Sequence, residues 1–260
     1  MTEDILLAAD RLTKRYGRPG RQTVALDEVS LSLRHGESLG IVGESGAGKS
    51  TLLRILLGLE RPDSGTVEFA GGPVDPRDSV AMRALRRQVQ VVFQDPRSSL
   101  DPRMRIGRSI AEPLRSLRLP GPHQPRVAEL LEAVGLDPAM ARRYPNAFSG
   151  GQRQRIAIAR ALAPDPSVLI ADEPVSALDM TVRRQIITML QRLTTERGMS
   201  LVMVSHDMAV VGQLCTNVIV MKSGQVIEAG KTATVFAAPD QAYTRELLAA
   251  VPQLPQTAAE

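Results

Sequence analysis

Residues 39–51 read LGIVGESGAGKST, an apolar run followed by glycines and then by a segment with helical spacing. Residues 43–50 match the pattern G-x-x-x-x-G-K-[ST]. Glycines in this pattern let the backbone curl so that its amides converge on phosphate oxygens, and the helix that follows adds the positive end of its dipole. The stretch therefore predicts a phosphate-binding loop between a buried strand and a helix.

The loop supplies most of the expected nucleotide contacts. We expect Lys49 to reach the β- and γ-phosphates and Ser50 to offer its hydroxyl to Mg²⁺. The expected nucleotide-binding residues of this segment are Gly43, Glu44, Ser45, Gly46, Ala47, Gly48, Lys49, Ser50 and Thr51.

Other segments predict the layers around the loop. The short apolar runs 168–171 and 201–204 are typical of parallel strands buried on both faces. Val29, Leu31 and Leu33 alternate with serines, which favours a half-exposed strand in a small antiparallel sheet. Helical spacing separates the apolar runs, at residues 51–59, 181–197 and 208–214. The order predicts an α/β fold with crossover connections.

Strand signals vanish between about residues 95 and 164, where helical segments dominate. We expect an inserted helical subdomain there, with helices over 105–117, 127–134 and 151–162. The proline-rich run PGPHQP at 120–125 predicts a loop that no helix continues through. Residues 1–235 then form one nucleotide-binding domain, and residues 236–260 form a short helix and a tail.

Polar residues follow two of the buried strands, at the sheet edge where ligands of parallel sheets collect. Asp172 ends the run 168–171 and offers a second metal contact, and Glu173 beside it can orient or deprotonate a water that attacks the γ-phosphate. His206 follows the run 201–204, so we expect it near the γ-phosphate. An acidic surface turn is the alternative interpretation of Asp172 and Glu173.

Composition excludes several classes of protein. The 260 residues are 43% hydrophobic and 23% charged, as in an ordinary globular chain rather than a disordered one. Four Phe, three Tyr and no Trp offer little for base stacking, so no nucleic-acid partner is expected despite a net charge of +4. The single Cys215 indicates a core residue. No signal peptide and no run of about 18 apolar residues is expected, so any membrane role would be peripheral.

Several motifs together resemble the ATP-binding cassette (ABC) ATPases. Residues 148–152, FSGGQ, resemble the family signature with Phe in place of the usual Leu, and Ser149 can cap the helix that carries Gln152. Gln94 in VVFQDP resembles the glutamine loop, SALD at 176–179 the loop containing Asp179, and His206 the switch histidine. Tyr16 falls where the family stacks a ring on adenine. The resemblance covers roughly residues 5–235.

The resemblance implies a P-loop NTPase core with a RecA-like parallel sheet, a small antiparallel β subdomain and the helical insertion. It implies ATP and Mg²⁺ as cofactors, with Ser50, Gln94 and Asp172 toward the metal. The catalytic residues would be Lys49, Gln94, Glu173 and His206. Two cassettes pair head to tail in the family, so the residues expected to reach the partner's nucleotide are Ser149, Gly150, Gly151, Gln152 and Asp179.

Two further stretches resemble the subfamily that imports peptides and nickel. FQDPRSSLDPR at 93–103 is similar to a stretch after its glutamine loop, and AYTRELL at 242–248 to its C-terminal element, with Gln241 and Ala242 where His-Pro is usual. The implied partners are a second cassette, either a paralogue or a copy, two membrane permeases and an extracytoplasmic binding protein. The implied place is the cytoplasmic face of the inner membrane.

Two alternatives stay open at this point. One is a soluble ATPase subunit of a non-transport complex, acting on nucleic acid or in carbon–phosphorus bond cleavage. The other is a regulatory cassette that does not hydrolyse ATP, which the presence of Glu173 and Gln152 disfavours.

Overall fold

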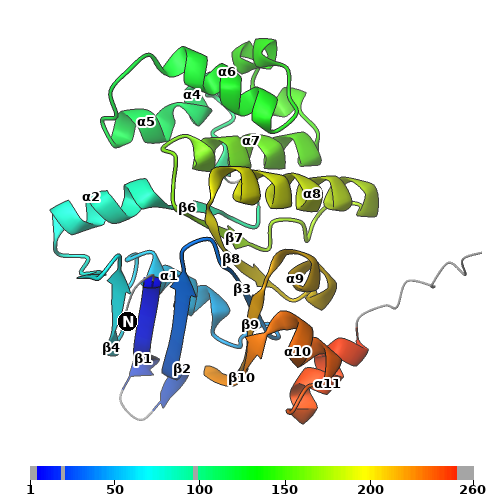
Figure 1. Ribbon diagram of the computed structural model, residues 1–260. Helices are drawn as coiled ribbons and strands as arrows, with labels where there is room; N and C mark the ends of the chain where they lie inside the picture. The colour runs from blue at the N-terminus through cyan, green and yellow to red at the C-terminus, as the bar shows by residue number, and fades with distance from the viewer. Residues whose placement is uncertain (1–4, 19–20, 96–98, 251–260) are drawn as a thin grey trace, which may run out of the picture.

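The computed structural model of the chain describes residues 5–18, 21–95 and 99–250. Its helices and strands form a layer of helices, a central six-stranded sheet and a smaller four-stranded sheet (Figure 1). This arrangement confirms the expected α/β fold class. Three residues of the subfamily-like stretch, Pro96, Arg97 and Ser98, lie outside the described residues.

The central sheet is built from the predicted apolar runs. β3 pairs in parallel with β8 and β9, and β7 pairs in parallel with β6 and β8, while β10 joins β9 as an antiparallel edge. Every residue of β8 is buried, as a strand covered on both faces requires. The strands in spatial order are β10 (Gln225–Lys231), β9 (Asn217–Lys222), β3 (Ser38–Val42), β8 (Ser200–Ser205), β7 (Val168–Asp172) and β6 (Val89–Val92).

Alternate residues of the central sheet face two separate hydrophobic cores. Leu169 points into the core that includes side chains of α7 (Gly150–Leu162) and α8 (Met180–Arg197). Val168 points into the other core, with α1 (Lys49–Leu56) and the four-stranded sheet. Both faces are therefore covered, and the sheet's carboxyl edge remains for ligands.

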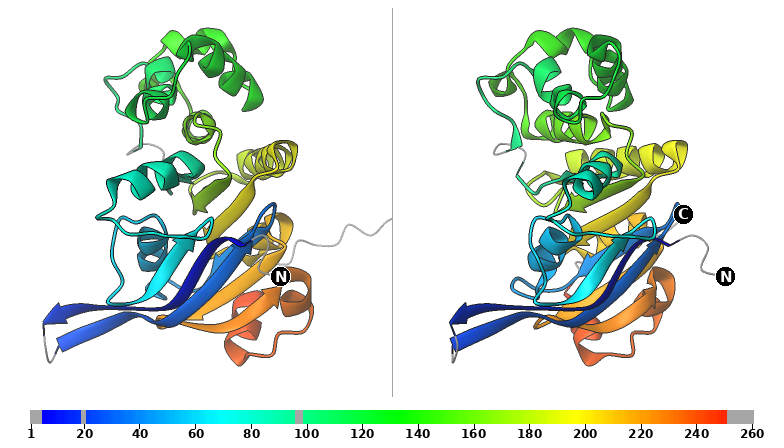
Figure 2. Two further views of the ribbon diagram at one scale, coloured as in Figure 1. Left: turned by 60° about the vertical axis from the view of Figure 1, so that its left-hand side comes forward. Right: turned by 90° about the vertical axis from the view of Figure 1, so that its left-hand side faces the viewer.

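The four-stranded sheet is antiparallel, as the alternating pattern predicts. Val29, Leu31 and Leu33 turn inward and are at most 9% exposed. Figure 2 shows β1 and β2 reaching as a long pair away from the rest of the molecule. The strands in spatial order are β2 (Arg21–Arg34), β1 (Ile5–Arg18), β4 (Ser64–Phe69) and β5 (Gly72–Pro73).

The helical layer lies between β6 and β7 in sequence. Its central helix, α7, packs against α4, α5 and α6 and also against β6, so it joins this layer to the sheet. α2 precedes β6 and is capped at its N-terminus by Asp78, whose carboxylate accepts two backbone amides. The helices and turns described between β5 and α7 are α2 (Ser79–Gln88), α4 (Ile106–Ile110), α5 (Glu112–Ser116), α6 (His123–Ala133), and the 3₁₀ turns η1 (Pro138–Arg142) and η2 (Pro145–Ala147).

Two expectations about this layer are wrong in detail. The loop expected over 120–125 ends earlier, because α6 already begins at His123 and holds Pro125 in its first turn. A proline is tolerated there since the first-turn amides have no helical acceptor. The single helix expected over 105–117 is instead α4 and α5, which meet at Ala111, just before Pro113. Proline near the start of α5 cannot continue the hydrogen bonds of α4.

The C-terminal part contains α9 (Met208–Leu214), α10 (Thr232–Ala237) and α11 (Ala242–Ala249). The domain boundary expected at residue 235 falls within α10. Cys215 is 6% exposed, and burial raises the pKa of its thiol to about 12. In the described part of the chain, no helix combines the length and the apolar character that crossing a membrane requires.

Candidate nucleotide-binding site

The phosphate loop leads from the end of β3 into α1, as expected from the sequence. Gly43, Gly46 and Gly48 all have positive φ, at 152°, 83° and 102°. At Gly48 a Cβ would also lie 2.4 Å from the Ala25 carbonyl oxygen, so this turn admits only glycine. Gly48 caps α1 without a side-chain acceptor. The first amides of α1 are therefore available to an anion.

Lys49 folds back onto this loop. Its Nζ donates to the carbonyl oxygens of Gly43 at 2.6 Å and Glu44 at 2.8 Å. Burial lowers the pKa of the Lys49 ammonium, against the raising effect of nearby Glu173 and Asp172. A phosphate placed beside this half-buried cation would favour its charged form.

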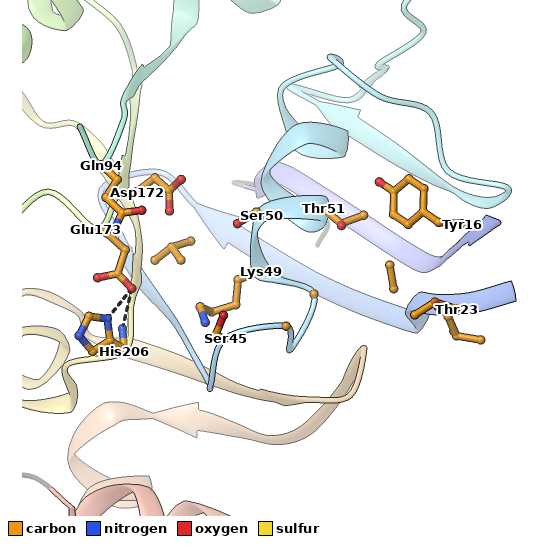
Figure 3. A pocket seen from close by; sticks show the side chains of 15 residues that line it. Tyr16, Thr23, Ser45, Lys49, Ser50, Thr51, Gln94, Asp172, Glu173 and His206 are labelled. Carbon is orange, nitrogen blue, oxygen red and sulfur yellow. Dashed lines mark hydrogen bonds and ion pairs between the residues drawn. The ribbon is translucent and has the colours of Figure 1, made fainter. Parts of the chain in front are cut away.

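A cavity of about 520 Å³ opens over the loop. Figure 3 shows Tyr16 toward one end, Gln94, Glu173 and His206 toward the other, and Lys49 between them. The cavity brings together eleven of the expected site residues, namely Tyr16, Ser45, Gly46, Gly48, Lys49, Ser50, Thr51, Gln94, Asp172, Glu173 and His206.

Three expected residues belong to the loop but do not line this cavity, namely Gly43, Glu44 and Ala47. A Cβ on Gly43 would lie 2.3 Å from the carbonyl oxygen of Met221 at the end of β9. Ala47 is 4% exposed, and its carbonyl accepts the amide of Gly224 at 3.1 Å. These residues brace the outer side of the loop.

Four lining residues carry no motif, namely Thr23, Val24, Ala25 and Val204. Thr23 and Val24 arrive through the antiparallel pairing of β2 with β1, where Thr23 lies opposite Tyr16. No spacing along the sequence indicates that contact. Val204 could have been found, because it ends the apolar run that leads to His206.

Tyr16 lines the cavity toward one end and is 39% exposed (Figure 3). Its hydroxyl donates to Glu60 Oε1 at 2.6 Å. Burial and then this hydrogen bond raise the pKa of Tyr16, so the phenol stays neutral. The held ring offers a flat surface on which a planar base can stack.

Glu173 and His206 form a close pair at the other end. Glu173 Oε1 lies 2.7 Å from His206 Nδ1 and accepts the backbone amide of His206 at 3.1 Å. Glu173 has a φ of 49°, in the left-handed region, and its own amide donates to the Val204 carbonyl at 2.9 Å. The side chain of Glu173 is 12% exposed, whereas that of His206 is 64% exposed. The carboxylate is thus fixed at the cavity wall while the imidazole remains open to solvent.

Asp172 lies beside Glu173 at the end of β7. Burial and then the charge of Glu173 raise the pKa of the Asp172 carboxyl, with Lys49 acting in the opposite direction. A further cation would relieve this excess of negative charge. Ser50, Gln94 and Asp172 line the same cavity and offer the oxygen ligands that Mg²⁺ prefers. The donor set therefore fits Mg²⁺ held jointly with phosphate oxygens. Among residues 5–18, 21–95 and 99–250, no cluster of three His, Cys, Asp or Glu side chains could hold a metal unaided.

The raised pKa of Asp172 gives a pH-dependent expectation. A carboxyl whose pKa is higher in the folded state makes the fold less stable as pH rises through the window between the unfolded and folded pKa values. Asp172→Asn should therefore increase the free energy of unfolding at pH 7, and the gain should be smaller at pH 5. Urea unfolding without nucleotide or Mg²⁺ at the two pH values measures it. A gain that grows on acidification would contradict the assignment.

The remaining expected residues lie together, outside the cavity lining. Ser149 caps α7 and shares reciprocal hydrogen bonds with Gln152, the Oγ accepting at 3.3 Å and the amide donating at 3.0 Å. A Cβ on Gly151 would lie 2.4 Å from Val182 Cγ1, so the N-terminal ends of α7 and α8 are in close contact. Asp179 caps α8 through the amide of Val182 at 2.9 Å. With Gly150, these residues form a second surface that we call the signature surface.

The fold and the cavity together define a nucleotide-binding protein of the P-loop NTPase class. The sequence profile of the ABC transporter family matches residues 26–176, more than half of the chain, and the chain therefore belongs to that family. This match confirms the resemblance described from the motifs.

Two curated relatives are about 50% identical in sequence to this chain. The glutathione import ATP-binding protein GsiA of Escherichia coli O6:H1 is 52% identical over 237 residues, covering 90% of this chain and 38% of GsiA. The GsiA of Salmonella choleraesuis is 50% identical over 239 residues, with 91% and 38% covered. The chain thus spans well under half the length of these relatives.

Solved cassettes share the fold. The ATP-binding cassette MJ0796, in a dimeric post-hydrolysis state bound to ADP and Pi, has a TM-score of 0.79 and 32% identity, covering 87% of this chain and 99% of that one. cbiO1 from Clostridium perfringens, part of the ABC transporter complex cbiONQ, has a TM-score of 0.80 and 30% identity, covering 96% and 97%.

Proposed function

We propose that this chain is the ATP-hydrolysing subunit of an ABC import system. The observation that carries the proposal is the single cavity that holds Tyr16 at one end, the phosphate loop in the middle and the Glu173–His206 pair at the other. Adenine, the phosphates and the attacking water would occupy these parts in that order.

Hydrolysis follows from the placement of the carboxylates. Glu173 accepts a proton from the water whose oxygen bonds to the γ-phosphorus, and the bond from that phosphorus to ADP breaks, releasing ADP and phosphate. A carboxylate only accepts hydrogen bonds, so Nδ1 of His206 carries the proton that holds Glu173 in place. Lys49 and the amides of α1 hold the phosphates, and Ser50, Gln94 and Asp172 would hold Mg²⁺. When bound, Mg²⁺ neutralises charge on the phosphate oxygens.

We further propose a head-to-tail pair of cassettes. The signature surface is outside the chain's own cavity, and it presents the exposed Ser149 and the N-terminus of α7, which suit an anion. The nucleotide of a second cassette is the ligand that fits it. The dimeric ADP-bound state of MJ0796 supports this arrangement by similarity.

We propose the domain limits expected from the sequence, with residues 1–235 as the nucleotide-binding domain and the helical subdomain at about 95–164. α4 to α7 fall within that insertion. Residues 236–260 form the C-terminal helix and tail.

The proposed cargo is a small peptide. The relatives at about 50% identity are named for import of glutathione, which is a tripeptide, and this supports a peptide over nickel and over a non-transport complex. The proposed partners are a second cassette, two permeases and an extracytoplasmic binding protein, with the chain on the cytoplasmic face of the membrane. No nucleic acid is expected among them.

The test is recovery of partners. A tagged Glu173→Gln chain, purified with ATP from gently solubilised native membranes, should bring down two multi-span permeases, identified by mass spectrometry. Recovery of soluble subunits alone would overturn the transport part of the proposal and leave the ATPase part standing. The wild-type chain without ATP is the control for contacts that do not depend on closure.

A further inference from the structure

Tyr243 of α11 contacts the phosphate loop from outside the nucleotide cavity. The Glu44 amide donates to the Tyr243 hydroxyl oxygen at 3.1 Å, across 199 residues of sequence. Tyr243 is 7% exposed, and neither residue lines the cavity. The C-terminal helix therefore supplies the acceptor for a loop amide that points away from the nucleotide.

Tyr243 is itself held against the loop. Lys222 Nζ lies 4.4 Å from the centroid of the Tyr243 ring, within the range of a cation–π contact. Lys222 follows Met221, whose carbonyl oxygen lies against the α-carbon of Gly43. The first two residues of the loop thus rest on the end of β9 and on the tyrosine.

Glu228 of β10 fixes the start of α11. It accepts the amides of Asp240 at 2.9 Å and Gln241 at 3.3 Å, as well as the hydroxyl of the fully buried Thr244. The N-cap residue of α11 makes no side-chain capping hydrogen bond, and Glu228 serves as the acceptor at this helix end instead. Although burial works against ionisation, these hydrogen bonds hold the pKa of Glu228 below its usual range.

We propose that Tyr243 is a positioning residue for the phosphate loop, and that its hydroxyl keeps the loop shaped for nucleotide before nucleotide binds. The inference rests on the proposed nucleotide-binding function. A loop with three glycines at positive φ has many alternative backbone conformations. Holding it in one of them lowers the ordering cost of binding. Because Tyr243 does not line the cavity, it acts on affinity and not on the reacting atoms.

The test is Tyr243→Phe, which removes one oxygen and keeps the buried ring. We expect about 5- to 10-fold weaker binding of ATP, since the partly buried amide of Glu44 loses its acceptor. The KM for ATP should rise to a similar degree while kcat changes by less than about twofold. Hydrogen exchange at the Glu44 amide without nucleotide should become faster. A purely structural role would lower the melting temperature and leave affinity, KM and this exchange unchanged.

Tyr144→Phe is the matched control. Tyr144 is 45% exposed, and its contact is Arg105, whose Nε lies 3.5 Å from the Tyr144 hydroxyl. This variant should bind ATP as the wild type does. If Lys49→Ala loses ATP while Tyr243→Phe behaves like Tyr144→Phe, the positioning role is overturned and the proposed function stands. If Lys49→Ala keeps wild-type affinity, the proposed function fails. Unchanged hydrogen exchange at the Glu44 amide in Tyr243→Phe would separately overturn the positioning role of Tyr243.

Discussion

Glu173→Gln should lower ATP turnover by about 100- to 10,000-fold, the usual contribution of a general base, while ATP binding stays close to that of the wild type. The glutamine keeps the shape of the side chain and an oxygen that can accept the His206 amide, now at 3.1 Å. It cannot take a proton from water. Phosphate release and titration of a fluorescent ATP analogue measure the two effects.

The same variant should accumulate as an ATP-bound pair of cassettes, because closure proceeds and reopening by hydrolysis does not. Size-exclusion chromatography with and without ATP reports this state. Glu196→Gln is the control, since Glu196 is an exposed carboxylate of α8 paired with Arg192 at 3.3 Å. Wild-type turnover in Glu173→Gln would remove Glu173 from the mechanism.

Lys49→Ala should weaken ATP binding by at least about 100-fold. The change deletes the cation of the phosphate loop. It also deletes the two charge-assisted hydrogen bonds that Lys49 donates to the carbonyl oxygens of Gly43 and Glu44. Isothermal titration with ATP and Mg²⁺ measures the loss. Lys231→Ala, at an exposed lysine of β10, should bind as the wild type does. Unchanged ATP affinity in Lys49→Ala would rule out the role assigned to the loop in binding the phosphates.

Local patterns predicted the centre of the site. The loop over 43–50, the strand that ends at Asp172 and the strand that leads to His206 depend on neighbours in sequence, and parallel strands bring their carboxyl ends to one edge. The cap of α7 by Ser149 was predicted for the same reason, because both partners lie within one turn.

Contacts between distant segments were not predictable in this way. Thr23 reaches the cavity because β2 pairs with β1, and that register depends on a tertiary sheet. The bond from Glu44 to Tyr243 depends on how the last helix packs. The prediction at Pro125 was wrong because proline disrupts the interior of a helix but is accepted in its first turn. The structure shows that α6 begins at His123, which places Pro125 in the first turn.

The burial of Cys215 has a practical consequence for experiments on this cassette. The sequence contains one cysteine, and its thiol is withdrawn from solvent with a pKa of about 12, so almost none is ionised at neutral pH. The native chain should therefore react little with maleimide reagents. A cysteine introduced at an exposed position such as Asn146, near the start of α7, would carry a fluorophore or spin label by itself. The proposed approach of the signature surface to a second cassette can then be tested in a protein from which no native cysteine has been removed.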